Sequence, residues 1–139
     1  MIAYLDASAI VKVLLSGEDG SGTAAELWDA ADLVVTSRVS YPEGRAALAA
    51  ARRARRVTGS AADRARLALD SMFDDLDVVE LDDGLAASAG DVADRFGLRA
   101  NDAIHLASAL ALEDPRVVVV TWDRELAAAA RRAELAVAP

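Results

Sequence analysis

Four consecutive valines, Val117 to Val120, constrain the fold of this chain more than any other stretch. A continuous apolar run of this kind predicts a strand at 116–121 that is buried on both faces. Further apolar segments predict strands at 2–5, 33–36 and 78–81, and residues 135–138 could add a short edge strand. A sheet built from such strands must be covered on both of its faces.

Segments with the helical spacing of apolar residues separate the strands. We expect helices at about 6–15, 23–31, 37–56, 60–73, 82–96, 99–112 and 123–133. Strands that alternate with helices predict an α/β fold with a mostly parallel sheet and helices on both faces. No internal repeat, linker or composition shift divides the chain, so we expect residues 1–139 to form a single domain.

The composition excludes several kinds of site and partner. A formal net charge of −8 argues against sequence-blind nucleic-acid binding, which relies on a broad basic surface. The absence of cysteine excludes disulfides and thiolate metal sites, and the single histidine, His105, excludes a multi-histidine metal cluster. No apolar segment is long enough to span a membrane, and no basic leader precedes the first strand. We therefore expect a cytoplasmic protein with no membrane partner.

Four carboxylates are predicted to meet at one edge of the sheet. All strands of a parallel sheet end at the same edge, where ligands bind. Asp6 and Asp123 follow the first strand and the valine strand, and Glu43 lies early in the helix that leaves the second strand. Asp102 lies at the start of the helix at 99–112, which must return the chain to the opposite edge. Taken singly, each residue could instead be a helix cap or a solvated side chain.

A cluster of carboxylates predicts a divalent cation. Without a cation the carboxylates would repel one another, and an oxygen-rich set without cysteine suits Mg²⁺ or Mn²⁺. The natural chemistry of such ions is phosphodiester hydrolysis. We expect Asp6 and Asp102 to hold the metal, while Glu43 and Asp123 complete the site or orient the attacking water.

Other polar residues are predicted to support this edge. Ser8 and Thr121 are placed to donate hydrogen bonds to the carboxylates. Four cations stand near enough to meet a phosphate or to pair with the carboxylates: Lys12, Arg45, Arg99 and Arg124. His105 has a suitable pKa for a general base, but in an apolar helix we interpret it as a packed, hydrogen-bonded residue.

Four short motifs, in this order along the chain, resemble those of one protein family. They are Asp6-Ala7-Ser8-Ala9, Thr36-Ser37 followed by Glu43, the segment Leu98 to Leu110, and Thr121-Trp122-Asp123-Arg124-Glu125-Leu126. The set resembles the PIN-domain ribonucleases, especially the VapC-type toxins of bacterial toxin–antitoxin pairs. The resemblance spans nearly the whole chain.

The resemblance implies a three-layer α/β/α sandwich, and it implies that Asp6, Glu43, Asp102 and Asp123 bind Mg²⁺ or Mn²⁺. The implied activity is endonucleolytic cleavage of RNA, held in check by a cognate antitoxin, in a protein that forms homodimers. Two details depart from the family pattern. Pro42 directly precedes Glu43, and Glu134 stands where a glycine often ends the last helix.

Several alternatives remain open from the sequence. The run from Arg52 to Arg56 is explained equally well as a solvated helix end and as a contact for an RNA backbone. A phosphoacceptor receiver domain has a similar size and acidity, but it needs a lysine after its fifth strand, and the only lysine here is Lys12. A non-catalytic interaction module with the same fold would be expected to lack one of the four carboxylates.

Overall fold

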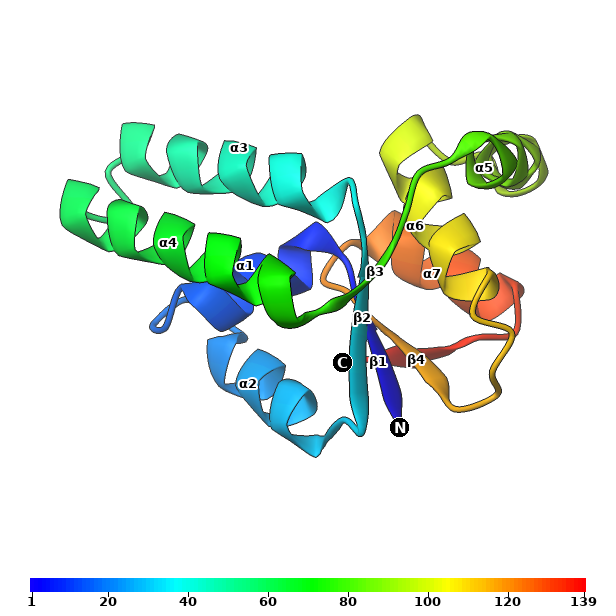
Figure 1. Cartoon of the computed structure of the whole chain (residues 1–139), viewed down its shortest axis with the longest axis horizontal. Helices are drawn as coiled ribbons and strands as arrows, with labels where there is room; N and C mark the ends of the chain where they lie inside the picture. The colour runs from blue at the N-terminus through cyan, green and yellow to red at the C-terminus, as the bar shows by residue number, and fades with distance from the viewer.

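The computed structural model describes all 139 residues and contains one sheet of five strands. The strands are β1 (Ile2–Leu5), β2 (Leu33–Ser37), β3 (Asp77–Val79), β4 (Val117–Val120) and β5 (Ala136–Ala138). Every neighbouring pair is parallel, in the order β3-β2-β1-β4-β5. The first strand therefore lies at the centre of the sheet, flanked by β2 and β4 (Figure 1).

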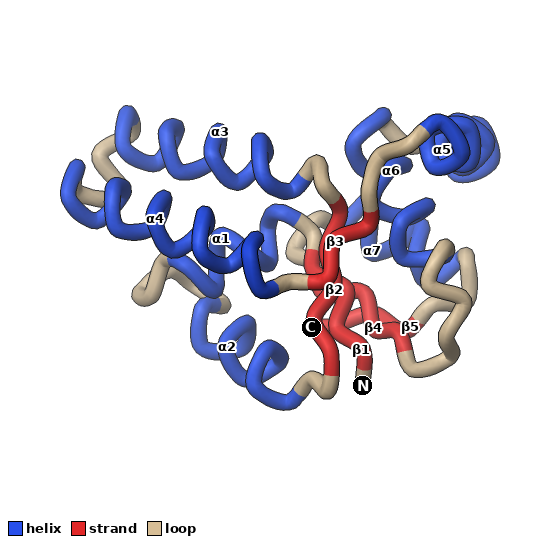
Figure 2. Tube along the Cα trace, in the orientation of Figure 1, coloured by secondary structure: helices blue, strands red, loops and turns tan.

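Seven helices cover the two faces of this sheet. They are α1 (Ala7–Leu14), α2 (Ser21–Ala30), α3 (Ser40–Arg53), α4 (Gly59–Asp75), α5 (Asp83–Phe96), α6 (Ala100–Leu110) and α7 (Arg124–Arg132). Helices α1 to α4 lie on one side of the strands and α5 to α7 on the other (Figure 2). The predicted α/β/α arrangement is thereby confirmed, and no helix has the length and apolar character needed to cross a bilayer.

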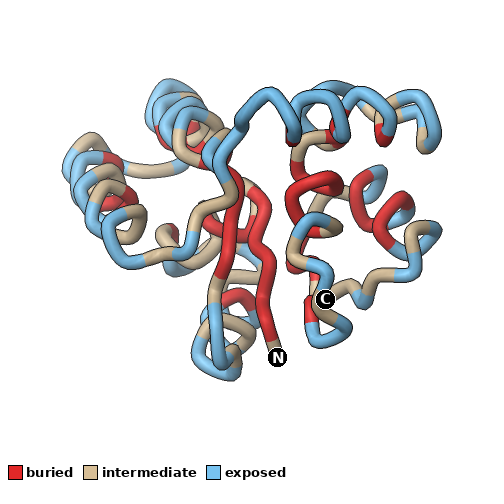
Figure 3. The backbone as a smooth tube through the Cα atoms, turned by 45° about the vertical axis from the view of Figure 1, so that its right-hand side comes forward, coloured by how far each residue is buried: buried red, intermediate tan, exposed pale blue.

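The side chains of β1 divide the core into two parts, because successive strand residues point to opposite faces. Ile2 and Tyr4 pack with buried residues of α5, α6 and α7, whereas Ala3 and Leu5 pack with α1, α3 and α4. All four are buried, and the buried parts of the chain follow the central strands (Figure 3). Tyr4 thereby brings a hydroxyl group into the layer that contains α6.

The helix α5 lies across the edge at which the strands end. In Figure 1 it is seen almost along its own axis, whereas α6 runs back beside the sheet towards β4. One of the two helices between β3 and β4 has to cross the sheet in this way for β4 to be parallel to β3. As a result α6 begins at the carboxyl edge of the sheet, as predicted.

Some predicted boundaries are wrong. The helix predicted at 37–56 is shorter, because β2 continues to Ser37 and the next amide, that of Arg38, donates to the carbonyl of Val79 at 2.9 Å. The helix predicted from 60 begins at Gly59, and Thr58 rather than Ser60 accepts the capping hydrogen bond. The third strand ends at Val79 instead of residue 81.

The edge strand β5 forms despite the absence of a glycine before it. Glu134 takes the left-handed conformation that a glycine would adopt without strain, with φ of 65°. Its amide donates to the carbonyl of Arg131 and so ends α7 before the chain turns into β5. The prediction of a short strand at 135–138 is confirmed.

The strand order also excludes the receiver-domain alternative. Receiver domains of the CheY type have the order 2-1-3-4-5, with the third strand beside the first. Here β3 pairs with β2 at one end of the sheet, and β1 pairs with β4.

Candidate active site

Three of the four predicted carboxylates line one hollow at the carboxyl edge of the sheet. Glu43 lies in the first turn of α3, Asp102 in the first turn of α6, and Asp123 is the N-cap of α7. With Arg99, Ala100 and Asn101 they enclose a cavity of about 480 Å³. The convergence of these three carboxylates follows from the topology, because each of the three helices starts at this edge.

Asp6 lies deeper and does not line that hollow. Its carboxylate accepts hydrogen bonds from Ser8 Oγ at 2.7 Å, the Ala9 amide at 2.9 Å and Thr121 Oγ1 at 2.6 Å. It is only 4% exposed, and burial raises its pKa although these hydrogen bonds oppose the shift. Asp6 therefore caps α1 and is a buried carboxylate at the end of the central strand.

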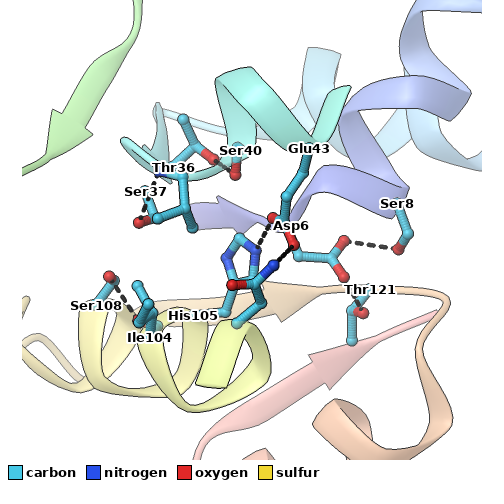
Figure 4. Close-up of polar contacts among 12 residues, drawn as sticks. Asp6, Ser8, Thr36, Ser37, Ser40, Glu43, Ile104, His105, Ser108 and Thr121 are labelled. Carbon is cyan, nitrogen blue, oxygen red and sulfur yellow. Dashed lines mark hydrogen bonds and ion pairs between the residues drawn. The ribbon is translucent and has the colours of Figure 1, made fainter. Parts of the chain in front are cut away.

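Thr121 connects Asp6 to the hollow. Its hydroxyl donates to Asp6 and accepts a hydrogen bond from the Asp123 amide at 3.0 Å. Ser8 has a similar bridging position, since it donates to Asp6 and accepts from the Trp122 amide at 3.0 Å. The two hydroxyl groups predicted to support the carboxylates thus fix the loop after β4 against the start of α1 (Figure 4).

Asp102 has an oxygen without a hydrogen bond. Its Oδ2 is the one buried side-chain oxygen or nitrogen of the protein that lacks a partner, and the nearest cation is Arg99, with its Nε 3.7 Å away. Burial raises the pKa of Asp102, and the nearby charge of Asp123 raises it further. An unpaired buried carboxylate oxygen is costly, and a cation is its natural partner.

Glu43 is held by two side chains of α6. Its Oε1 accepts from Asn101 Nδ2 at 2.9 Å, and its Oε2 lies 2.7 Å from His105 Nε2 (Figure 4). Pro42, which precedes it, occupies the first turn of α3, where a missing amide hydrogen costs nothing. Glu43 is therefore fixed in place although Pro42 departs from the family pattern.

His105 is buried and hydrogen-bonded on both sides of its ring, as predicted. Nδ1 lies 3.0 Å from the hydroxyl of Tyr4, while Nε2 faces Glu43. Burial raises the pKa of Tyr4, so its hydroxyl stays protonated and can donate to Nδ1. The chain of contacts runs from the core, through the imidazole, to a carboxylate of the hollow.

The oxygen ligands at this edge suit a divalent ion, but they do not form a complete coordination site in this arrangement. The candidate ligands are carboxylate oxygens, and Asp102 offers one that is unpaired. No three of the Asp, Glu and His side chains stand close enough together to hold a metal ion as they are arranged. Mg²⁺ tolerates this, because it keeps several waters and usually takes one or two protein carboxylates.

The four predicted cations have different surroundings. Arg99 lines the hollow and is exposed, whereas Arg124 is exposed at the start of α7 with no ion pair. Arg45 donates to the hydroxyl of Tyr41. Lys12 donates to the carbonyl of Asp19 and lies over the Trp122 ring. None of the last three pairs with a site carboxylate.

Two residues of the site were missed from the sequence. Tyr4 lies within the apolar segment 2–5, which predicts only a buried strand, although a buried tyrosine hydroxyl needs a partner. Asn101 was passed over beside Asp102. Tyr4 could have been identified from the alternation of side chains along β1, because this alternation turns Tyr4 to the face that α6 covers.

Comparison with known proteins agrees with this architecture. Residues 3–132 match the PIN domain family. Ribonuclease VapC45 of Mycobacterium tuberculosis is 46% identical over 138 residues, which is 99% of this chain and 95% of the relative. The crystal structure of M. tuberculosis VapC20, a sarcin-ricin loop cleaving toxin, superposes with a TM-score of 0.69 at 21% identity, over 91% of this chain and 94% of VapC20. VapBC-5, a member of the VapBC family of toxin–antitoxin systems from the same organism, superposes with a TM-score of 0.63 at 23% identity. The superposition covers 98% of this chain and 96% of the VapBC-5 chain.

The fold is that of a PIN domain. The chain belongs to the PIN domain family and, within it, to the group that contains the VapC proteins.

Replacing Asp102 by asparagine is expected to stabilise the protein when divalent cations are absent. The substitution removes a largely buried charge whose Oδ2 lacks a hydrogen bond, which Asp123 repels and which only the long contacts with Arg99 and His105 favour. We expect the free energy of unfolding near pH 7, measured by urea denaturation in EDTA, to rise by about 0.5–1 kcal/mol. Folding raises the pKa of Asp102, so the ionised carboxylate destabilises the parent protein only above that raised pKa. The difference in the free energy of unfolding between variant and parent therefore shrinks as the pH falls towards about 4.

Asp91→Asn is the matched control, because Asp91 is exposed on α5 and makes no ion pair. This control is expected to change the free energy of unfolding by less than about 0.5 kcal/mol. If Asp102→Asn were less stable than the parent near pH 7 in EDTA, the carboxylate would not be strained as described.

The hydrogen bonds around His105 are expected to hold a ring proton on Nε2. Tyr4 donates to Nδ1, and the Glu43 carboxylate accepts from Nε2, so this tautomer satisfies both hydrogen bonds. The protein has a single histidine, so ¹⁵N-histidine labelling gives one imidazole signal whose two nitrogen shifts report the tautomer. A proton found on Nδ1 near pH 7 would contradict the assignment, and Tyr4→Phe is expected to weaken the preference for Nε2.

Proposed function

We propose that this protein is a divalent-metal-dependent endoribonuclease that cleaves RNA phosphodiester bonds. The observation that carries the proposal is the unpaired Oδ2 of Asp102, in a hollow that also holds Glu43 and Asp123. The name of the 46% identical relative, Ribonuclease VapC45, supports RNA as the substrate class. Carboxylate ligands favour Mg²⁺ or Mn²⁺ as the ion.

The residues of the hollow would hold the ion and the substrate. Asp102 is the first candidate ligand, and Glu43, Asp123 and the deeper Asp6 are the others. The ion supplies Lewis-acid stabilisation of the charge that develops on the phosphoryl group. Asp6 is anchored by Ser8 and Thr121, so its carboxylate is held in a fixed position at the end of β1.

The other side chains would position Glu43 and the phosphate. His105 and Asn101 each hold one oxygen of Glu43, which leaves the carboxylate a single orientation towards the hollow. Arg124 at the start of α7 makes no ion pair, and Arg99 at the rim is exposed with only a long ion pair to Asp102, so both can meet a substrate phosphate. Lys12 and Arg45 remain weaker candidates for RNA binding, because both already have partners inside the protein.

We further propose that the protein acts as a toxin whose activity a cognate antitoxin inhibits. The structural likeness to VapBC-5, a member of a toxin–antitoxin family, supports this partner. A homodimer and a location in the cytoplasm are part of the same proposal. A non-catalytic module is disfavoured, because all four carboxylates are present and Oδ2 of Asp102 makes no hydrogen bond.

The proposal is tested by the cleavage of RNA with purified protein. We expect cleavage in Mg²⁺ or Mn²⁺ and none in EDTA, and we expect Asp6→Asn and Asp102→Asn each to lower the rate at least about 100-fold. The readout is the rate at which a labelled RNA is cut, and Asp91→Asn serves as the control with an unchanged rate. An Asp102→Asn protein that cut RNA as fast as the parent would refute the assigned site.

A further inference from the structure

The positive charge of this acidic protein is concentrated in one segment. Residues 45–66 contain seven of the fourteen arginines and a single acidic residue, Asp63. The segment therefore carries a formal charge of +6, while the whole chain carries −8, so the remaining residues are at −14. We call the segment 45–66 the arginine hairpin.

The arginine hairpin is an exposed projection of the fold. It comprises most of α3, the turn after it and the first half of α4, two helices that lie side by side away from the sheet (Figure 1). Arg45, Arg52 and Arg66 line a shallow cavity of about 150 Å³ between the two helices. The hairpin thus has a groove with arginines on both walls.

Most of these guanidinium groups are free or weakly engaged. Arg53, Arg55 and Arg64 are exposed and make no hydrogen bond or ion pair. Arg52 contacts Asp63 at 3.4 Å and Arg56 contacts Glu18 at 2.9 Å, in exposed pairs that contribute little to stability. The charge of the hairpin is therefore available to a ligand from outside.

Helix termination does not explain the arginine at the turn. The Arg55 amide donates to the carbonyl of Arg52 and the Arg56 amide to that of Ala51, which is the Schellman pattern that ends a helix. Arg55 occupies the left-handed position of this motif, with φ of 57°, where glycine is the favoured residue. The turn therefore accepts an exposed arginine at a position where glycine would be unstrained.

We propose that the arginine hairpin binds the phosphate backbone of RNA next to the acidic hollow. This inference rests on the proposed ribonuclease function, because RNA must approach an edge whose carboxylates repel phosphates. The hairpin begins two residues after Glu43, and Arg52 lies about 14 Å farther along the helix axis from Glu43. A polyanion attracted by the hairpin would reach the hollow at one end.

Guanidinium groups suit this ligand, because they bind phosphate oxygens through two parallel hydrogen bonds. All seven basic residues of the hairpin are arginines. Backbone contacts of this kind would position RNA without reading its sequence.

The test compares two triple variants with the same change of charge. The hairpin variant is Arg53→Gln, Arg55→Gln and Arg64→Gln, whose side chains make no contact that the fold needs. The control variant is Arg95→Gln, Arg131→Gln and Arg132→Gln, on α5 and α7. Binding of a short fluorescent single-stranded RNA is measured in EDTA over a series of salt concentrations.

We expect the hairpin variant to bind at least about 10-fold more weakly than the parent at low salt, and the control to stay within about twofold. The slope of log K against log salt should be shallower by about 2 in the hairpin variant, since each lost phosphate contact contributes about 0.7. Equal losses in the two variants would overturn the proposal, because net charge alone would then govern binding.

A third measurement separates RNA from an acidic protein ligand. If the hairpin variant bound RNA like the parent but lost binding to polyglutamate, the hairpin would be a site for acidic peptide and the proposal would be wrong. Binding in EDTA needs no cleavage. A protein that bound RNA through the hairpin without cutting it would therefore refute the proposed function and leave this inference standing.

Discussion

The hydrogen bonds that the Asp6 carboxylate accepts are the interactions on which the rest of the site depends. This carboxylate caps α1 directly after the central strand, and through Thr121 it joins β1 to the loop that carries Asp123. A buried charge is tolerated there only because three donors satisfy it. The same hydrogen bonds therefore hold together the two strand ends from which the acidic edge is built.

The second constraint is the separation of charge over the surface. The edge of the sheet gathers carboxylates, one of which has a buried oxygen without a hydrogen bond, while half of the arginines lie on a hairpin that starts at that edge. An acidic protein that acts on a polyanion needs both features, because the carboxylates serve a cation and the arginines serve the phosphates. The negative net charge of the whole chain hides this arrangement.

Much of the architecture could be predicted from the sequence, because parallel strands and their helices follow from apolar periodicity. The prediction that Asp102 lies at this edge required only the direction in which α6 runs along the sheet. The contacts of Glu43 could not be predicted, since they depend on the side chains that α6 presents to α3, which lie 58 and 62 positions away in sequence. The deeper position of Asp6 was missed for a related reason: topology places a strand end at an edge but does not give its depth.

The central claim is that the acidic edge holds a divalent cation through Asp102. The most direct measurement is a crystal structure of the protein grown with Mn²⁺, with anomalous difference density recorded for manganese. A peak bound by Asp102 and by at least one of Asp6, Glu43 and Asp123 is the predicted result. Manganese bound elsewhere, or an edge without a peak at saturating Mn²⁺, would contradict it.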